Sequence, residues 1–267
     1  SGLYGFSEQN PAPYVGLTET DGNGFFVDQI HVVPHIGFNV PPVSISLQDF
    51  YDISDKITEA NYDYTAEAEL VIERLANTAV NDTRKFFIEI FDDKGGLGKL
   101  LQFALWGVYN PTYEQNVMFE VGNRVAEYEA VLYSWREKIR YNLIRPTTII
   151  KSGQYTNEFI NTWGGPFQGV QSIRFNDIKP FVRVMPHSEY PSGSGCICRM
   201  LMDFVDKFVQ SEFPSSGLTS LPVVASKIPG IFRPSQEEPG GSHEDLQYTF
   251  TDMEDLYFNC KFSRLWG

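Results

Sequence analysis

The sequence of 267 residues contains no apolar run that approaches about eighteen residues, so it predicts no membrane-spanning helix. It also lacks an excess of basic residues, because 21 Lys and Arg stand against 34 Asp and Glu, for a formal net charge of −13. So acidic a chain is a poor candidate for binding nucleic acid or anionic membrane surfaces. Any anion site in it must therefore be a local cluster of cations that works against the field of the whole chain.

Cysteine and histidine are too few and too scattered to predict a metal site. The cysteines are Cys196, Cys198 and Cys260. Their spacing fits neither a metal-ligand set nor a disulfide framework, so we expect buried thiols. The histidines that belong to no motif are His31, His35 and His243. Although His31 and His35 are four residues apart, the proline between them forbids a regular helix, and we expect structural or surface roles for all three.

Most of the sequence has a hydrophobic pattern with helical periodicity. An apolar content of 42% is enough for a large core. Residues 1–62 are rich in Gly, Pro, Asn and aromatics, which predicts an irregular segment with short extended pieces such as residues 24–33. The rest predicts one helical domain over residues 63–267. We therefore expect an all-α fold, a helical bundle preceded by an irregular N-terminal segment.

The periodicity and its breaks place the individual elements. It predicts helices over 65–91, 97–110, 112–144, 196–213 and 251–267, and short strands over 221–226 and 246–250. Thr65 is expected to cap the first helix, and Thr251 with Glu254 forms an expected capping box for the last. Pro146 is expected to stop the third. Residues 151–190 read as loop and short helix.

Two cations lie on one stripe of the third predicted helix. Lys138 and Arg145 are seven residues apart, about two turns, so both side chains point to nearly the same face, with Trp135 three residues before the lysine. Taken alone, this stripe is best interpreted as a solvated basic face. Arg264, near the end of the last helix, is by itself best interpreted as an ordinary surface or helix-end arginine.

The stretch "HSEYPSGSGCIC", residues 187–198, places glycines and hydroxyls directly before a predicted helix. It allows two interpretations. One is a loop followed by a helix cap. The other is an anion-binding site, because a helix N-terminus presents free backbone N–H groups and the positive end of the helix dipole.

Taken together and in order, these pieces resemble a known three-part signature. The pieces are Lys138–x6–Arg145–Pro146, then Pro191–Ser192–Gly193, then Ser263–Arg264. They are similar to K-x6-R-P, P-S-G-H and S-R-x3-G-x-H of the vanadium haloperoxidase and type-2 phosphatidic acid phosphatase superfamily. Trp135 before the lysine, and His187 in "HSEYPSG", resemble the haloperoxidase branch. The similarity covers roughly residues 85–267.

This resemblance implies a helical-bundle enzyme with vanadate as cofactor, which oxidises a halide with hydrogen peroxide and passes the product to a small organic acceptor. By the resemblance, the oxyanion-binding residues are Lys138, Arg145, Ser192, Gly193 and Arg264. The lysine would also polarise the peroxide, and Trp135 and His187 would line the halide pocket. Self-association into a homo-oligomer is common in the family and is expected here on that ground alone.

Two departures from the signature bear on the chemistry. Ser194 stands where the family has the acid–base histidine of the catalytic set, and serine has no useful pKa near neutrality. His187 either reaches the same pocket from its loop or only orders that loop. The histidine that binds vanadium in the family would fall three residues past Gly267, so no metal ligand is expected within the chain.

Three functions follow from the resemblance. The first is a vanadium haloperoxidase. The second is an acid phosphatase that uses the same oxyanion site on phosphate esters, which the loss of the acid at Ser194 disfavours because an alkoxide leaving group needs a proton. The third is a non-catalytic relative that binds an oxyanion.

Overall fold

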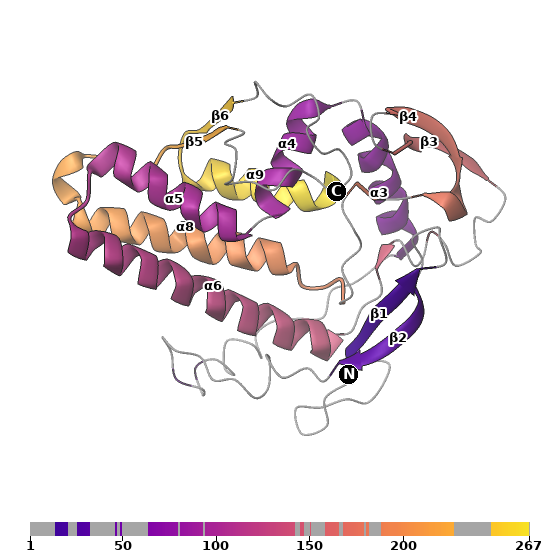
Figure 1. Ribbon diagram of the computed structural model, residues 1–267, viewed down its shortest axis with the longest axis horizontal. Coiled ribbons are helices and arrows are strands. Elements are labelled where there is room, and N and C mark those ends of the chain that lie inside the picture. Colours follow the sequence, from indigo (N-terminus) through magenta and orange to yellow (C-terminus); the bar gives the residue numbers. More distant parts are fainter. Residues whose placement is uncertain are drawn as a thin grey trace. The chain divides into compact units, whose positions relative to one another are not determined.

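A computed structural model gives the structure of the chain (Figure 1). It describes residues 14–20, 26–32, 46, 49, 64–79, 81–92, 94–141, 145–146, 150, 158–165, 168–178, 180–181, 188–226 and 247–266. The chain divides into two compact units. The first unit is Ser1–Val80 with Val131–Gly193, and the second is Asn81–Ala130 with Ser194–Gly267. Helix α6, Tyr113–Tyr141, runs from the second unit into the first.

In the first unit, one helix packs against a hairpin. Helix α3 spans Tyr64–Ala79 and buries Ala68, Ile72 and Leu75, which recur at the spacing of one helical face. This face lies against strand β3, Phe159–Trp163. The apolar stripe of the helix therefore forms part of the core of this unit.

Residues 158–178 form a hairpin and a short 3-10 helix where the sequence predicts loop and short helix. Strand β4, Val170–Arg174, pairs antiparallel with β3 and leads into η1, Phe175–Asp177. Gly165 and Gly169 in the connecting turn have φ angles of 113° and 62°, a region that glycine adopts readily. The strand signal is weak in the sequence because β4 is mostly exposed and lacks an alternating buried face.

A second hairpin lies in the N-terminal segment. Strand β1, Tyr14–Thr20, pairs antiparallel with β2, Phe26–Val32, which lies within the extended piece expected over 24–33. His31 is on β2, whereas His35 and His243 lie outside the described residues. The division of the chain into a segment 1–62 and a domain 63–267 stays a prediction.

Most of the second unit is helical. Its elements are α4 (Asp82–Asp92), α5 (Lys94–Tyr109), the first part of α6, α8 (Gly193–Glu212, from Ser194 onward), η2 (Pro214–Ser216), β5 (Val223–Ser226), β6 (Gln247–Phe250) and α9 (Met253–Trp266). Strands β5 and β6 pair antiparallel, which confirms both strands predicted here. The ring of Phe87 on α4 meets Tyr248 of β6 edge to face, with 4.8 Å between centroids.

Helices α6 and α8 approach closely within the second unit. A Cβ atom added at Gly122 of α6 would lie 2.4 Å from the ring of Phe204 on α8. Phe119 meets the ring of Phe208 one turn away, with 5.2 Å between centroids. The glycine therefore lets the two helices pack at a distance that a larger residue would prevent, and Figure 1 shows them side by side with α5.

The all-α prediction is confirmed, but one helix boundary is wrong. The helix expected over 65–91 is two helices, α3 and α4, with Asn81 between them. The Asn81 side chain accepts the backbone N–H of Arg84 at 3.0 Å and so caps α4, a role that the hydrophobic pattern hides. Helix α3 begins at Tyr64, one residue before Thr65, which is the expected cap.

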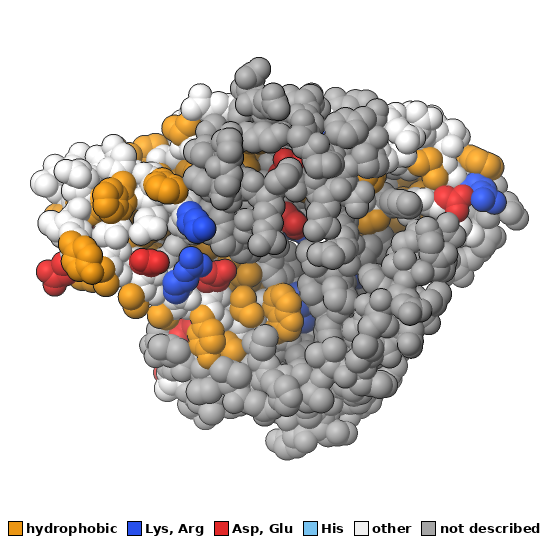
Figure 2. All heavy atoms as spheres, in the orientation of Figure 1, with side chains coloured by type: hydrophobic (Ala, Val, Ile, Leu, Met, Phe, Trp, Pro, Cys, Tyr) orange, Lys and Arg blue, Asp and Glu red, His pale blue; other side chains and the backbone are white. Residues whose placement is uncertain are grey.

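Over the described helices, length and hydropathy together rule out a membrane-spanning segment. The second unit nevertheless exposes large apolar side chains along α5 and α6. They are Phe103, Trp106, Val108, Tyr113, Val117, Met118 and Val121. Figure 2 shows apolar side chains interrupted by single charged ones on this part of the surface.

Candidate oxyanion site

Lys138 lies in the last part of α6, within the first unit, and only 1% of its surface is exposed. Its ammonium group donates hydrogen bonds to the backbone carbonyls of Ser188 and Glu189, at 2.7 and 3.1 Å. Its neighbours Arg136 and Glu137 are buried as well. The interpretation of a solvated basic face is therefore wrong for Lys138, because α6 turns this charge toward the protein.

Arg145 follows α6 in the same unit. Its guanidinium group forms an ion pair with the carboxylate of Glu189 at 3.1 Å, and both side chains are about one quarter exposed, at 23% and 28%. Glu189 thus contacts both cations of the first motif, Lys138 through its backbone oxygen and Arg145 through its carboxylate. The two cations share one neighbour, although Lys138 is 51 residues and Arg145 is 44 residues before it in the sequence.

The glycine at the start of α8 lies against the same stripe of α6. A Cβ atom added at Gly193 would lie 2.9 Å from the ring of Trp135 and 3.6 Å from the Lys138 side chain. The Lys138 ammonium lies 5.9 Å from the centroid of that ring. Ser192, just before Gly193, is exposed. The first unit therefore brings Trp135, Lys138, Arg145 and the Ser192–Gly193 tip to the loop of residues 188–190.

Such a set of groups is suited to a compact oxyanion. An ammonium and a guanidinium supply charge-assisted donors, and the first N–H groups of α8 lie at the positive end of the helix dipole. The glycine at the tip lets the backbone approach the Trp135 ring closely, since any Cβ there would press on that ring. Donors of these kinds are the ones that bind tetrahedral oxyanions in proteins.

Arg264 belongs to the second unit. It lies in the last turn of α9, and its guanidinium group pairs with the carboxylate of Asp92 at the end of α4, at 3.1 Å. The arginine side chain is 18% exposed. Ser263 beside it is fully buried and donates its hydroxyl to the backbone carbonyl of Cys260 at 2.7 Å. Arg264 is therefore a helix-end arginine, as one of the two isolated interpretations has it, and its role toward an oxyanion stays a prediction.

A disulfide bond between Cys198 and Cys260 joins α8 to α9. The expectation of three buried thiols is wrong, because residues 62 apart in the sequence meet when the two helices pack. Cys196 is half-buried and takes no part in this disulfide bond. The bond anchors the helix that carries Arg264 to the helix that begins with the glycine tip.

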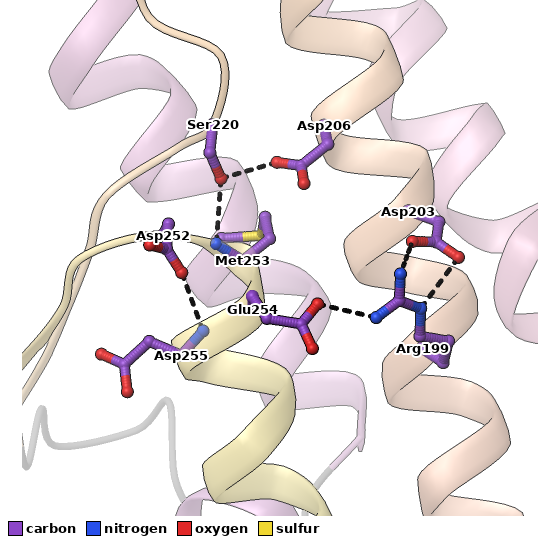
Figure 3. Close-up of polar contacts among 8 residues, drawn as sticks. All are labelled: Arg199, Asp203, Asp206, Ser220, Asp252, Met253, Glu254 and Asp255. Atoms are coloured by element: carbon purple, nitrogen blue, oxygen red, sulfur yellow. Dashed lines mark hydrogen bonds and ion pairs between the residues drawn. The ribbon is translucent and has the colours of Figure 1, made fainter.

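Polar contacts also tie these two helices together (Figure 3). Arg199 on α8 pairs with Asp203 on its own helix at 2.8 Å and with Glu254 on α9 at 2.7 Å. Asp252 caps α9 by accepting the backbone N–H of Asp255 at 2.8 Å. The cap expected from Thr251 and Glu254 is therefore wrong, since Glu254 turns toward α8 instead.

The start of α9 is also bound through Ser220. The Ser220 hydroxyl accepts the backbone N–H of Met253 at 2.9 Å and donates to the carboxylate of Asp206 at 2.6 Å (Figure 3). Burial raises the pKa of Asp206 above its ordinary value, and the nearby carboxylates of Asp203 and Asp252 raise it further, against the hydrogen bond from Ser220.

His187 lies outside the described residues, so its place relative to Lys138 stays a prediction. Ser194 lies in the first turn of α8 and is half-buried. Across the described part of the chain, no three His, Cys, Asp or Glu side chains gather in a way that could hold a metal ion.

Glu189, the residue that both cations contact, belongs to none of the three sequence motifs. A signal was available, because an acidic residue three positions before Ser192 of the Pro191–Ser192–Gly193 motif is unexpected in an anion site. Only the folded structure shows the role of Glu189, since nothing in the local sequence connects residue 189 to residues 138 and 145.

Known proteins resemble this chain in sequence and in fold. Residues 118–267 match the family described as VCPO second helical-bundle domain. Two solved structures resemble the whole chain, a holo-type bacterial vanadium-dependent chloroperoxidase with a TM-score of 0.71 and an apo-type one with a TM-score of 0.70, each 21% identical. The match covers 100% of this chain but only 59% and 60% of those chains. No curated protein matches the chain.

Proposed function

Because the chain belongs to the family of the VCPO second helical-bundle domain, we propose that it acts as a vanadium haloperoxidase, which binds vanadate and oxidises a halide with hydrogen peroxide. The observation that carries the proposal is the meeting of Lys138, Arg145 and Gly193 at residues 188–190, within one unit of the fold. A cluster of cations at a glycine-bearing helix start is unusual in a chain with a net charge of −13.

In this proposal each group of the site has a separate task. Lys138 and Arg145 hold oxygens of the anion through charge-assisted hydrogen bonds, and the Ser192 hydroxyl and the Gly193 N–H add neutral donors. Arg264, oriented by its ion pair with Asp92, is the third cation. When bound, vanadate supplies Lewis-acid activation of peroxide.

The surroundings of Lys138 suit this task. Its ammonium group is buried and directed by two backbone carbonyls, so it stays in one orientation and needs no rearrangement when charge develops nearby. The Trp135 ring beside it offers an apolar wall for a polarizable halide. A proton carrier is still required, because Ser194 cannot serve as one near neutral pH, and we assign that task to His187.

The test compares halide oxidation with anion binding in the protein at its natural length. We expect orthovanadate to bind and to induce bromination of a dye that depends on both peroxide and bromide. Lys138→Met removes the ammonium but keeps most of the side-chain volume, and it should abolish bromination. Lys207→Met, at an exposed position of α8, is the matched control and should leave it unchanged.

Other results of the same assay would replace the proposal. Hydrolysis of a phosphate ester without vanadate, and no bromination, would make the protein an acid phosphatase. Vanadate binding without either reaction would make it a non-catalytic oxyanion-binding relative. His187→Ala with unchanged bromination would remove His187 from the mechanism.

A further inference from the structure

Glu189 places a negative charge where the proposed function needs positive charge. Its carboxylate pairs with Arg145 at 3.1 Å, and its backbone carbonyl accepts a hydrogen bond from Lys138 at 3.1 Å. The Lys138 bond fixes the backbone of residue 189, so the carboxylate is held within reach of Arg145. The main cationic partner of an incoming oxyanion thus already has an anion of the protein itself beside it.

A carboxylate and a tetrahedral oxyanion use the same donors of a guanidinium group. An oxyanion that binds at Arg145 must therefore either displace the Glu189 carboxylate or accept a like charge beside it. We propose that Glu189 is an internal competitor for Arg145, which lowers the affinity of the site for oxyanions and sets how that affinity depends on anion charge. This inference rests on the proposed function, because it assigns a task at the same site.

A purely structural role for Glu189 gives a different expectation. If the ion pair only orders Arg145, its removal should loosen the guanidinium group and weaken every anion equally. If the carboxylate competes, its removal should strengthen binding, and the gain should grow with anion charge. Coulomb energy is proportional to each charge, so the gain for a dianion should be about the square of the gain for a monoanion.

Sulfate and perchlorate separate the two roles because both are tetrahedral with four oxygens and differ in charge. Calorimetric titration of the protein at its natural length should show that Glu189→Gln tightens sulfate binding about tenfold and perchlorate binding about threefold. Glu254→Gln is the matched control. Glu254 also pairs with an arginine, Arg199 at 2.7 Å, but this ion pair of the second unit includes neither Arg145 nor Lys138, so neither affinity should change.

The outcomes distinguish this inference from the proposed function. If the unaltered protein binds sulfate and Glu189→Gln binds it no more tightly, Glu189 is not a competitor and the oxyanion site stands. Equal gains for sulfate and perchlorate would also overturn the inference, because charge would not be the cause. If neither protein binds either anion, both the site and the role of Glu189 are rejected. Urea unfolding of Glu189→Gln verifies that the titrated protein is folded.

Discussion

Two arginine clusters in this molecule look alike locally and differ in charge. In the first unit, Arg145 and Lys138 share one acidic neighbour, Glu189, so these three groups carry two positive charges and one negative. In the second unit, Arg199 is shared by Asp203 and Glu254, which gives one positive charge and two negative. Both arrangements pair a guanidinium group with a carboxylate, but only in the first do the named groups carry more positive than negative charge, as the proposed anion site requires.

The two clusters also differ in how deeply their side chains are buried. The Arg199 side chain is 47% exposed and Glu254 is 71% exposed, so water and salt screen the pair and it contributes little to stability. Lys138 is 1% exposed, and an ion held next to it would be screened far less. An ion pair on the protein surface joins two helices in the second cluster, whereas the first cluster contains a buried lysine, as the proposed anion site requires.

The largest expected effect concerns the anchoring of α9 in the second unit. Replacing Cys198 and Cys260 with serine opens a loop closed over a separation of 62 residues, which should lower the free energy of unfolding by about 4 kcal/mol. Urea unfolding measures this loss. Cys196→Ser, at the cysteine outside the disulfide bond, is the control and should have little effect. Equal stabilities of the double variant and the control would mean that the bond does not stabilise the unit.

The close approach at the glycine tip gives the next effect. In Gly193→Ala the new Cβ meets the Trp135 ring at 2.9 Å, so we expect a loss of about 1–3 kcal/mol in unfolding free energy together with weaker sulfate binding. Gly107→Ala is the contrasting change. Nothing lies within 4 Å of its Cβ, and alanine should stabilise α5 by about 0.5–1 kcal/mol. Thermal unfolding measures the change in stability of each variant, and calorimetric titration measures sulfate binding by Gly193→Ala.

Replacing one arginine in each cluster tests the comparison between them directly. Arg145→Gln removes a charge-assisted donor from the proposed site and should weaken sulfate binding about tenfold or more. Arg199→Gln should leave sulfate binding unchanged and lower the unfolding free energy by less than about 1 kcal/mol, since its partners are exposed. Equal loss of binding in both variants would show that the effect is general to the acidic chain and not a property of one cluster.

The smallest effect is the pH dependence that Asp206 contributes. Its pKa is raised on folding, so the folded protein holds this proton more tightly than the unfolded chain does. Stability from this group is therefore present at low pH and is lost as pH rises from about 4 through the raised pKa. Asp206→Asn keeps an acceptor for the Ser220 hydroxyl and should flatten that slope in urea unfolding measured from about pH 4 to 7. An unchanged slope would assign the dependence to other groups.

The sequence predicts elements well where periodicity is strong and poorly where partners are distant. Helix α8 follows from its apolar stripe, since Ile197, Leu201 and Phe208 are buried and Arg199 is exposed. The β3/β4 hairpin does not follow, because its strands have no alternating buried face. The division between α3 and α4 depends on one side-chain cap at Asn81, which periodicity cannot detect.

The site shows the same limit. Order and spacing of basic residues indicated Lys138 and Arg145 through a resemblance, yet local sequence alone favoured a solvated face. Burial of Lys138 comes from carbonyls fifty residues away, and the bond between Cys198 and Cys260 comes from the packing of two helices. The role of Glu189 does not follow from the sequence, because it depends on two long-range contacts and not on the residues next to it in the chain.

The central claim is that Lys138, Arg145 and the Ser192–Gly193 tip together bind a tetrahedral oxyanion. A crystal of the protein soaked in tungstate, a heavy anion of the right shape and charge, tests this claim most directly through its anomalous diffraction. We predict one strong peak within hydrogen-bonding distance of the Arg145 guanidinium group and the Gly193 backbone nitrogen. A peak elsewhere on the chain, with none beside these residues, would contradict the account.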